Sequence, residues 1–461
     1  MRATELLRLL PLAAFLLGGC AVGPAYVLPV TPEPAAFKEA QGWSPAAPAD
    51  ALDRGPWWTL FNDPILNELA AQIEVSNQNV AAAVASYAQA RSLVQQQRAS
   101  LFPSVSLSTS GERSGTRNAG AENNYRLNIG TSWEPDLWGR LRASVTAASA
   151  NAQASAADLA SARLSAQGEL AANYFVVRQT DAQAALLAAT IEGYQRVLQI
   201  TRNRFDAGIA TKSDVLQAQT QLSNAQIDAL SLARQRAQFE HAIAILLGRA
   251  PADFTLASAP WQAFVPEIPV GVPSALLQRR PDIAAAERRV AAANEQIGIA
   301  RSAYYPNIGL SASVGNGGSR VSDLFSASNA LWSFGLSAAQ SLFNAGATRA
   351  SVAGAEASQQ AAVARYRQTV LDAFGDVENQ LSATRVLAQQ LVLRRQASES
   401  ADQVEAQLLN RYKAGQVSYS EVVQAQASAL SARRALVQAQ GDRQSTAISL
   451  IQALGGGWQA Q

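Results

Sequence analysis

The chain has 461 residues, which is enough for two ordinary domains or one large repetitive one. Only 16% of the residues are charged and the formal net charge is +2, so no basic face for a nucleic acid is expected. One His, one Cys and one Met leave little for metal binding or nucleophilic chemistry. We therefore expect a protein that is not an enzyme, with no catalytic residue, no metal site and no cofactor.

Residues 1–19 have the pattern of a secretory signal peptide. Arg2 and Arg8 precede the apolar run Leu9–Leu17, which is too short to span a membrane. The tetrapeptide Leu-Gly-Gly-Cys that ends at Cys20 resembles a bacterial lipobox, which implies a lipid (diacylglycerol, palmitate) on Cys20 as the mature N-terminus. Because Ala21 is not Asp, the analogy with bacterial lipoproteins implies sorting to the outer membrane. The alternative is an ordinary signal peptide with an incidental Cys.

A helix over Leu66–Ser100 and two strands are predicted next. Apolar and polar residues alternate with period two in both strands, which is typical of a sheet with one apolar face. The apolar positions are Val105, Leu107 and Thr109 in the first strand and Tyr125, Leu127, Ile129 and Trp133 in the second. The segment Gly111–Asn124 between them is expected to be a loop.

A long helix is predicted from Arg140 to Phe205, followed by a turn at Gly208 and a helix over Ser213–Leu247. The first of these segments contains no Pro and has roughly 65 residues, which corresponds to about 100 Å of helix. Its apolar residues recur in alternating steps of three and four, as in coiled coils. Helices of this length pack side by side and do not form a globule.

The whole arrangement occurs twice. The segment that begins at Arg204 and ends at Gly208 recurs at Arg411 to Gly415, an offset of 207 residues, and the segment at Asp214 recurs with the same offset. We therefore divide the chain after the signal peptide into 20–65, a first repeat 66–250, a Pro-rich linker 251–281, a second repeat 282–455 and a tail 456–461. The second repeat is expected to contain helices Asp282–Ser302, Thr348–Tyr412 and Ser418–Leu454, two alternating strands, and a loop Asn316–Asn329.

The four strands have the pattern of a membrane β-barrel. One face is apolar, the other carries small polar residues, and aromatic residues gather near the strand ends, at Phe102, Trp138, Tyr304, Tyr305, Trp332 and Phe343. Four strands cannot close a barrel, because the known minimum is about eight. If these strands span a membrane, the protein must be an oligomer. A soluble half-buried sheet is the alternative.

The two turns after the long helices share a local pattern. Gly208 and Gly415 stand where a left-handed residue ends a helix. Three residues later a capping box begins, Thr211-x-x-Asp214 in one copy and Ser418-x-x-Glu421 in the other. The simplest interpretation is that Asp214 and Glu421 only cap their helices. His241 lies on an apolar helix without a second His or Cys, and we interpret it as structural.

Several further motifs are distributed along the chain. They are Val22-Gly23-Pro24-x-Tyr26-x-x-Pro29, Trp57-Trp58-x-x-Phe61-x-Asp63-Pro64-x-Leu66, Leu277-x-Arg279-Arg280-Pro281-Asp282-Ile283, and Ala286-Glu287, Ala292-Ala293-Asn294, Ile297-Gly298 and Tyr305-Pro306. With these motifs the chain resembles the outer membrane factor family, the TolC-like channels, in the lipoprotein branch that serves resistance–nodulation–division efflux pumps. The resemblance covers essentially the whole chain.

This resemblance implies a homotrimer with a shared membrane β-barrel and a long periplasmic helical barrel. Segment 20–65, the linker and the tail would form a belt around the helices, and the loops between paired strands would face outside the cell. A periplasmic adaptor (membrane fusion) protein and an inner-membrane pump are the implied partners, and the channel would be a passive duct for drugs or toxic compounds.

The resemblance also implies a periplasmic gate. Asp214, Tyr412 and Glu421 match family positions that constrict the closed pore at the turns. The chain departs from some members in having Val417 in place of an Arg and Gln424 in place of an acidic residue, which implies a reduced closing network.

Two other classes remain as alternatives. A lipid-anchored periplasmic coiled-coil scaffold or adaptor without a pore would explain the helices and the lipid, but not the duplicated alternating strands. A secreted enzyme would need a nucleophile motif or a set of metal ligands, which the sequence does not show.

Overall fold

The computed structural model describes residues 22–31, 37–39, 56–116, 119–266, 268 and 280–456. The predicted signal peptide, Cys20, and the tail beyond residue 456 lie outside these described residues. The same holds for the part of the family signature from Leu277 to Arg279. The described chain divides into two compact units, one containing residues 85–158 and 282–369 and the other residues 56–84, 159–266 and 370–456.

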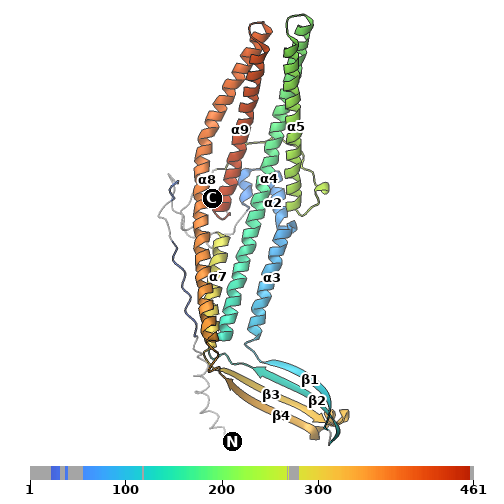
Figure 1. Cartoon of the computed structure of the whole chain (residues 1–461), viewed down its shortest axis with the longest axis vertical. Coiled ribbons are helices and arrows are strands. Elements are labelled where there is room, and N and C mark those ends of the chain that lie inside the picture. Colours follow the sequence, from blue (N-terminus) through green and yellow to red (C-terminus); the bar gives the residue numbers. More distant parts are fainter. Residues whose placement is uncertain are drawn as a thin grey trace. The chain divides into compact units, whose positions relative to one another are not determined.

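A four-stranded antiparallel sheet belongs to the first unit. Its strands are β1 Ser104–Thr116, β2 Ala119–Trp133, β3 Asn307–Gly318 and β4 Ala330–Ala339, and they lie side by side in chain order (Figure 1). The strand pair of each repeat forms a hairpin, and the two hairpins join through β2 and β3. The sheet therefore combines equivalent parts of both repeats, and β1 and β4 are its edges.

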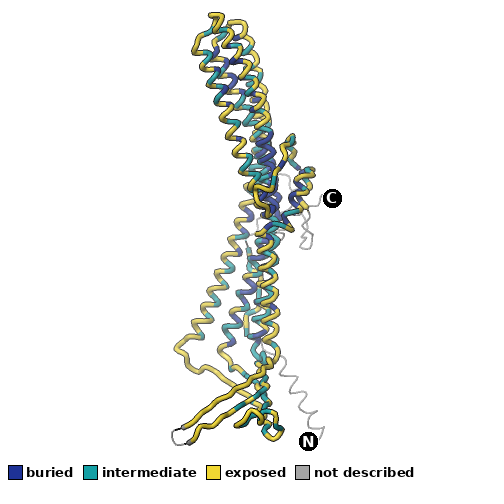
Figure 2. The backbone as a smooth tube through the Cα atoms, turned by 90° about the vertical axis from the view of Figure 1, so that its right-hand side faces the viewer, coloured by how far each residue is buried: buried dark blue, intermediate teal, exposed yellow. Residues whose placement is uncertain are grey.

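The register of the sheet aligns the apolar side chains into rows. Leu107 pairs with Ile129, Ile129 with Val314, and Val314 with Trp332, so one apolar row crosses all four strands. All four residues are at least half exposed, and Trp332 is 82% exposed. In Figure 2 much of the sheet is exposed, while most residues of β3 have intermediate exposure. No element among the described residues covers this apolar face.

The other face of the sheet carries small polar side chains. Ser106 pairs with Gly130, Gly130 with Ser313, and Ser313 with Ser333, whose hydroxyls lie 2.8 Å apart. The predicted alternation is thus confirmed, because apolar and small polar side chains lie on opposite faces of the sheet. Outward apolar and inward polar rows are the arrangement expected of a barrel wall.

The predicted loop Gly111–Asn124 is wrong, because most of it continues the first hairpin. The pairing extends from Gly111 opposite Tyr125 to Thr116 opposite Ala119. The apolar alternation stops before this extension, which contains Glu112, Arg113 and Glu122, so the pattern did not indicate a strand. The second segment, 316–329, is closer to the expectation, since it contains the end of β3 and two short 3-10 helices, Val321–Phe325 and Ala327–Asn329.

The first repeat has α2 Pro64–Ser76, α3 Gln78–Ala99, α4 Arg140–Asp206 and α5 Lys212–Leu246, and the second has α7 Pro281–Ser302, α8 Ala347–Lys413 and α9 Tyr419–Ala453. Three helices of the first repeat, α3, α4 and α5, correspond to α7, α8 and α9 of the second among the described residues. The long helices α4 and α8 have 67 residues each. Each ends within one residue of the predicted position, and each forms a hairpin with the helix that follows (Figure 1).

The predicted helix Leu66–Ser100 is in fact two helices that break at Asn77. Asn77 has an extended backbone, and its side chain is 97% buried. Its carboxamide nitrogen donates to the carbonyl of Leu246 at 2.7 Å, and its carboxamide oxygen accepts from the amide of Val80 at 3.0 Å. Asn77 therefore starts α3 and at the same time attaches this break to the end of α5.

One core cluster of the second unit combines aromatic and aliphatic side chains and lies where α2, α4, α5 and α9 meet. A 3-10 helix, Trp57–Phe61, brings Trp57, Trp58 and Phe61 into this core, against Phe175 and the fully buried Leu66. Asp63 then starts α2 by accepting hydrogen bonds from the amides of Ile65 and Leu66. The Trp57 to Leu66 motif of the sequence is thus a packing and capping motif.

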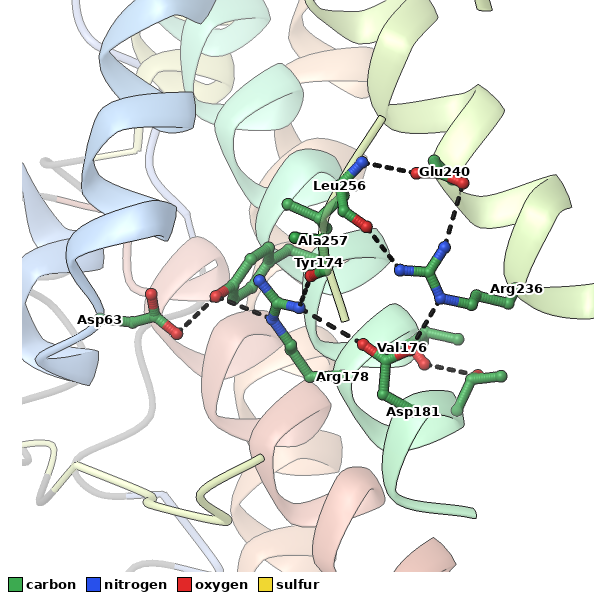
Figure 3. A network of polar contacts seen from close by, with 10 residues as sticks. Asp63, Tyr174, Val176, Arg178, Asp181, Arg236, Glu240, Leu256 and Ala257 are labelled. Carbon is green, nitrogen blue, oxygen red and sulfur yellow. Dashed lines mark hydrogen bonds and ion pairs between the residues drawn. The ribbon is translucent and has the colours of Figure 1, made fainter. Parts of the chain in front are cut away.

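Buried polar residues attach the segment after α5 to α4. Tyr174 on α4 donates to the carboxylate of Asp63 at 2.6 Å, and Arg178 donates to the Tyr174 hydroxyl at 3.1 Å and to the carbonyl of Ala257 at 2.7 Å (Figure 3). Burial, followed by the hydrogen bond to Asp63, raises the pKa of Tyr174, because both disfavour the phenolate. Tyr174 therefore stays a neutral donor.

A second arginine completes this network. Asp181 accepts from Arg178 at 3.3 Å and from Arg236 on α5 at 2.7 Å. Arg236 also donates to the carbonyl of Leu256 at 2.6 Å and to Glu240 at 3.1 Å, and Glu240 accepts from the amide of Leu256 (Figure 3). Removing one member would leave buried charges unpaired, which is costly. The start of the inter-repeat linker is thus held on α4 and α5.

Among the described residues, no helix combines the length and the apolar character that crossing a membrane requires.

Candidate functional site: the turns that end the long helices

The turns after α4 and α8 have the same backbone geometry. Gly208 and Gly415 have φ values of +72° and +76°, the left-handed conformation that favours glycine. The amides of Ile209 and Gln416 donate back to the carbonyls of Arg204 and Arg411, at 2.8 and 2.9 Å. This is the 6→1 bond of a Schellman motif, which closes the end of a helix.

The two capping boxes differ in their hydrogen bonds. In the first repeat the bonds are reciprocal, since the amide of Thr211 donates to Asp214 at 2.9 Å and the amide of Asp214 donates to the Thr211 hydroxyl at 3.2 Å. In the second repeat Glu421 accepts from both the amide and the hydroxyl of Ser418, at 3.1 and 3.0 Å. Asp214 and Glu421 therefore both act as caps, and Glu421 remains exposed.

Tyr412 lies inside a cluster, not on an open surface. Its side chain is 96% buried and its ring is 5.3 Å from that of Tyr419. The cluster joins both hairpins, and its buried members are Tyr194, Val197, Leu198, Ala218, Leu222, Ala225, Tyr412, Tyr419 and Val422. The Tyr412 hydroxyl is buried and makes no hydrogen bond within the described chain. The structure thus brings Tyr412 to Tyr419 and not into a hydrogen bond with Asp214 or Glu421.

Arg204, which the sequence marked only as part of the repeat, links the two hairpins. Its guanidinium lies 4.7 Å from the centre of the Tyr412 ring and donates to the carbonyls of Tyr412 and Lys413 at 3.0 and 3.2 Å. These carbonyls belong to the last turn of α8, where a cation is favoured by the helix dipole. Arg204 therefore caps α8 from the neighbouring hairpin.

Tyr419 is a second residue that the sequence analysis missed. Burial raises its pKa, and the neighbouring Tyr412, Tyr194 and Asp214 raise it further. Tyr419 therefore stays neutral within the cluster. Comparison of the two repeats could not have indicated Tyr419, because the equivalent position of the first repeat is Lys212.

The departures from the family pattern have simple surroundings. Val417 packs as a partly buried side chain on the tyrosine cluster, and Gln424 is exposed on α9. In the described part of the chain, no group of three His, Cys, Asp or Glu residues is placed to hold a metal ion.

Comparison with known protein families shows which family contains this pattern of turns and strands. The family model described as outer membrane efflux protein matches the chain twice, over residues 69–249 and 272–456. The chain belongs to the outer membrane efflux protein family. The double match also confirms the tandem repeat, because each copy of the family domain covers one predicted repeat.

Two curated relatives from Pseudomonas putida are each 32% identical over 99% of this chain and 97% of their own length. They are the antibiotic efflux pump outer membrane protein ArpC and the toluene efflux pump outer membrane protein TtgC. Among solved structures, the outer-membrane channel OprN aligns with a TM-score of 0.88 and 30% identity, over 95% of this chain and 100% of its own. These findings confirm the predicted family, the mixed fold of long helices and a four-stranded sheet, and the function as an outer-membrane channel component of an efflux system.

Proposed function

We propose that this efflux channel is a homotrimer that forms a passive duct, with one membrane β-barrel and one periplasmic helical barrel shared by three chains. The observation that supports this most is the sheet. Its apolar row Leu107–Ile129–Val314–Trp332 is exposed, and strands β1 and β4 are open edges in the single chain. Open edges cannot persist in a bilayer, because their backbone groups would have no partners.

Closure between chains removes both problems. If β4 of one chain pairs with β1 of the next, three chains of four strands give a barrel of twelve, within the even-numbered range of bacterial barrels. The apolar rows would then face lipid, and the serine rows would face a wet lumen. The number three comes from the family resemblance, while the need for closure comes from the sheet itself.

A lipid on Cys20 would attach the same chain to the outer membrane. This part of the proposal is supported by the Leu-Gly-Gly-Cys sequence and by Ala21. The lipid would be the only non-protein group, and the helices would extend into the periplasm. The chain itself supplies no energy in this proposal, so transport depends on a pump.

The turns at Gly208 and Gly415 are the proposed contact for a periplasmic adaptor protein, which would connect an inner-membrane pump. Asp214, Tyr412 and Glu421 remain the proposed gate at this end. The buried Tyr412 and the capped carboxylates support a closed resting arrangement held mainly by packing. If an adaptor captures the wild-type channel but does not capture a channel variant in which both turns are replaced, the result would support this contact.

Small organic compounds are the proposed substrates. Relatives at 32% identity are named for antibiotics and for toluene, so we propose no single compound class. The duct is tested by reconstituting the purified full chain in planar bilayers. If stepwise conductance disappears when Trp332 and Phe334 are both replaced by Asp, the result would support a barrel, since charges on its lipid-facing surface are costly. If membranes stay silent both with correctly folded wild-type protein and with a Tyr412→Ala variant, whose closed arrangement is weakened, the result would instead favour a scaffold without a pore.

A further inference from the structure

The turn region contains one complete contact between hairpins and the two halves of a second one. In the complete contact, Arg204 of the first repeat covers the ring of Tyr412 and binds the last carbonyls of α8. The equivalents of Arg204, Tyr412 and Lys413 at the repeat offset of 207 are Arg411, Phe205 and Asp206. Each of these three residues occupies the position in its own repeat that its equivalent occupies in the other repeat.

The second set is exposed in the single chain. Phe205 is 42% exposed, whereas Tyr412 is only 4% exposed under Arg204. Arg411 is exposed, and its side chain makes no hydrogen bond or ion pair among the described residues. A methyl group built on Gly415 would meet the Arg204 guanidinium at 3.9 Å, but one built on Gly208 would meet nothing within 4 Å. The place that Arg411 would occupy is therefore open.

The same asymmetry continues below the turns. Val197 on α4 is 4% exposed in the cluster between the hairpins, while its equivalent, Val404 on α8, is 48% exposed. Arg434 on α9 makes an ion pair with Asp228 on α5 at 2.7 Å, and the position equivalent to Arg434 is Ile227, which is 58% exposed. One face of each repeat is thus covered by the other repeat, and the equivalent faces are exposed in the described part of the chain.

We propose that Arg411 binds the last turn of α4 in a second copy of this chain, covering Phe205 and pairing with Asp206 of that copy. The inference rests on the proposed ring of three chains. In a ring of six hairpins, each hairpin contacts the next through the same two faces, because a head-to-tail contact repeats until it closes. The contact between Arg204 and Tyr412 inside the chain is then the template for the contact between chains.

The contact between chains differs from its template in charge. Inside the chain, the carbonyl that accepts from Arg204 belongs to Lys413, a residue of the same sign. Between chains, the equivalent residue is Asp206, so Arg411 gains a carboxylate in addition to the helix carbonyls. At the turns, the contact between chains would therefore include an ion pair with the end of the neighbouring long helix, whereas the contact within a chain uses only the Tyr412 ring and the carbonyls of α8.

Cross-linking between differently tagged chains tests this proposal. Chains with Arg411→Cys are co-expressed with full-length chains carrying Asp206→Cys and a second tag, and the outer membranes are treated with a short bis-maleimide. We expect a covalent dimer that carries both tags. The matched control pairs Arg204→Cys with Lys413→Cys on separate chains, which should give no such dimer, because that contact lies within one chain. Wild-type chains, whose only Cys is Cys20, should give none either.

A charge exchange gives a second measurement. Arg411→Asp alone or Asp206→Arg alone should lower the temperature at which the detergent-solubilised trimer dissociates, and the two together should restore most of the loss. Intact trimers without the two-tag dimer, or a double variant no better than the singles, would overturn the inference while leaving the proposed function in place. Protein that is monomeric in every variant and in wild type would overturn the proposed trimer, and this contact with it.

Discussion

At the level of single residues, Glu421 has a structural role and a proposed pore role at the same position. Its carboxylate accepts two hydrogen bonds from Ser418 at the start of α9, and it is exposed near the turn. Three such carboxylates around a narrow aperture would favour cations. A substitution that removes both functions at once cannot separate them.

Glu421→Gln separates the two roles, because Gln serves a capping box nearly as well as Glu. We expect this variant to fold and assemble normally but to lose cation preference in planar-bilayer recordings. Glu421→Ala is the control for capping and should cost roughly 1 kcal/mol of stability. Unchanged selectivity and conductance in the Gln variant would mean that Glu421 only caps its helix.

Cys20 is the residue on which the anchor depends. Replacing it by Ser removes the sulfur that would carry the lipid, so we expect incorporation of labelled palmitate to disappear while the barrel still inserts. The measurement is fatty-acid labelling together with the mass of the mature N-terminus. A mature N-terminus at any other residue would rule out the lipoprotein prediction.

At the level of elements, the junction between α2, α3 and α5 depends on a close backbone approach. Gly248 follows α5 with φ +65°, and a side chain there would meet the carbonyl oxygen of Ser76 at 2.2 Å. The neighbouring Asn77 side chain holds this approach through Leu246. The backbone of Ser76 cannot move away without breaking that bond.

Gly248→Ala should therefore destabilise the chain much more than Gly208→Ala does. Both glycines are left-handed, so each Ala costs about 1–2 kcal/mol of backbone strain. Only at Gly248 must backbone also shift, because nothing lies within 4 Å of a methyl group at Gly208. Unfolding temperatures from circular dichroism compare the pair, and equal losses would show that the approach to Ser76 is not tight.

The sequence predicted the elements whose signals are local. Both long helices lack Pro and end before a left-handed Gly, so their ends at Asp206 and Lys413 were within one residue of the prediction. The strand alternation likewise gave the faces of the sheet. The break at Asn77 was missed, because the partner that holds its side chain, Leu246, lies 169 residues away in the chain.

The turn region shows the same limit. Asp214 and Glu421 were predictable as caps, since a capping box is a pattern over four residues. The roles of Arg204 and Tyr419 depend on contacts between the two hairpins, over about 200 residues of chain. Only the repeat offset connected Arg204 with Arg411, and it could not indicate that the first binds the end of a helix within the described chain and the second does not.

At the level of the whole molecule, the duplication explains why a single chain is incomplete. Each repeat supplies one strand hairpin and one helix hairpin, and the chain joins them once, between β2 and β3 and between Arg204 and α8. The equivalent surfaces remain exposed in the described part of the single chain. They are the sheet edges formed by β1 and β4, and the residues Phe205 and Arg411 at the turns. A closed ring of identical chains satisfies all of them with contacts that the chain already uses.

The most direct test of this account is the mass of the unheated, detergent-solubilised protein by light scattering, with the detergent contribution subtracted. Twelve strands shared by three chains predict a complex with the mass of three chains. After heating, this complex should give single chains whose electrophoretic migration is altered. A stable monomer that keeps its β-structure would contradict the account, since four strands cannot close a barrel alone.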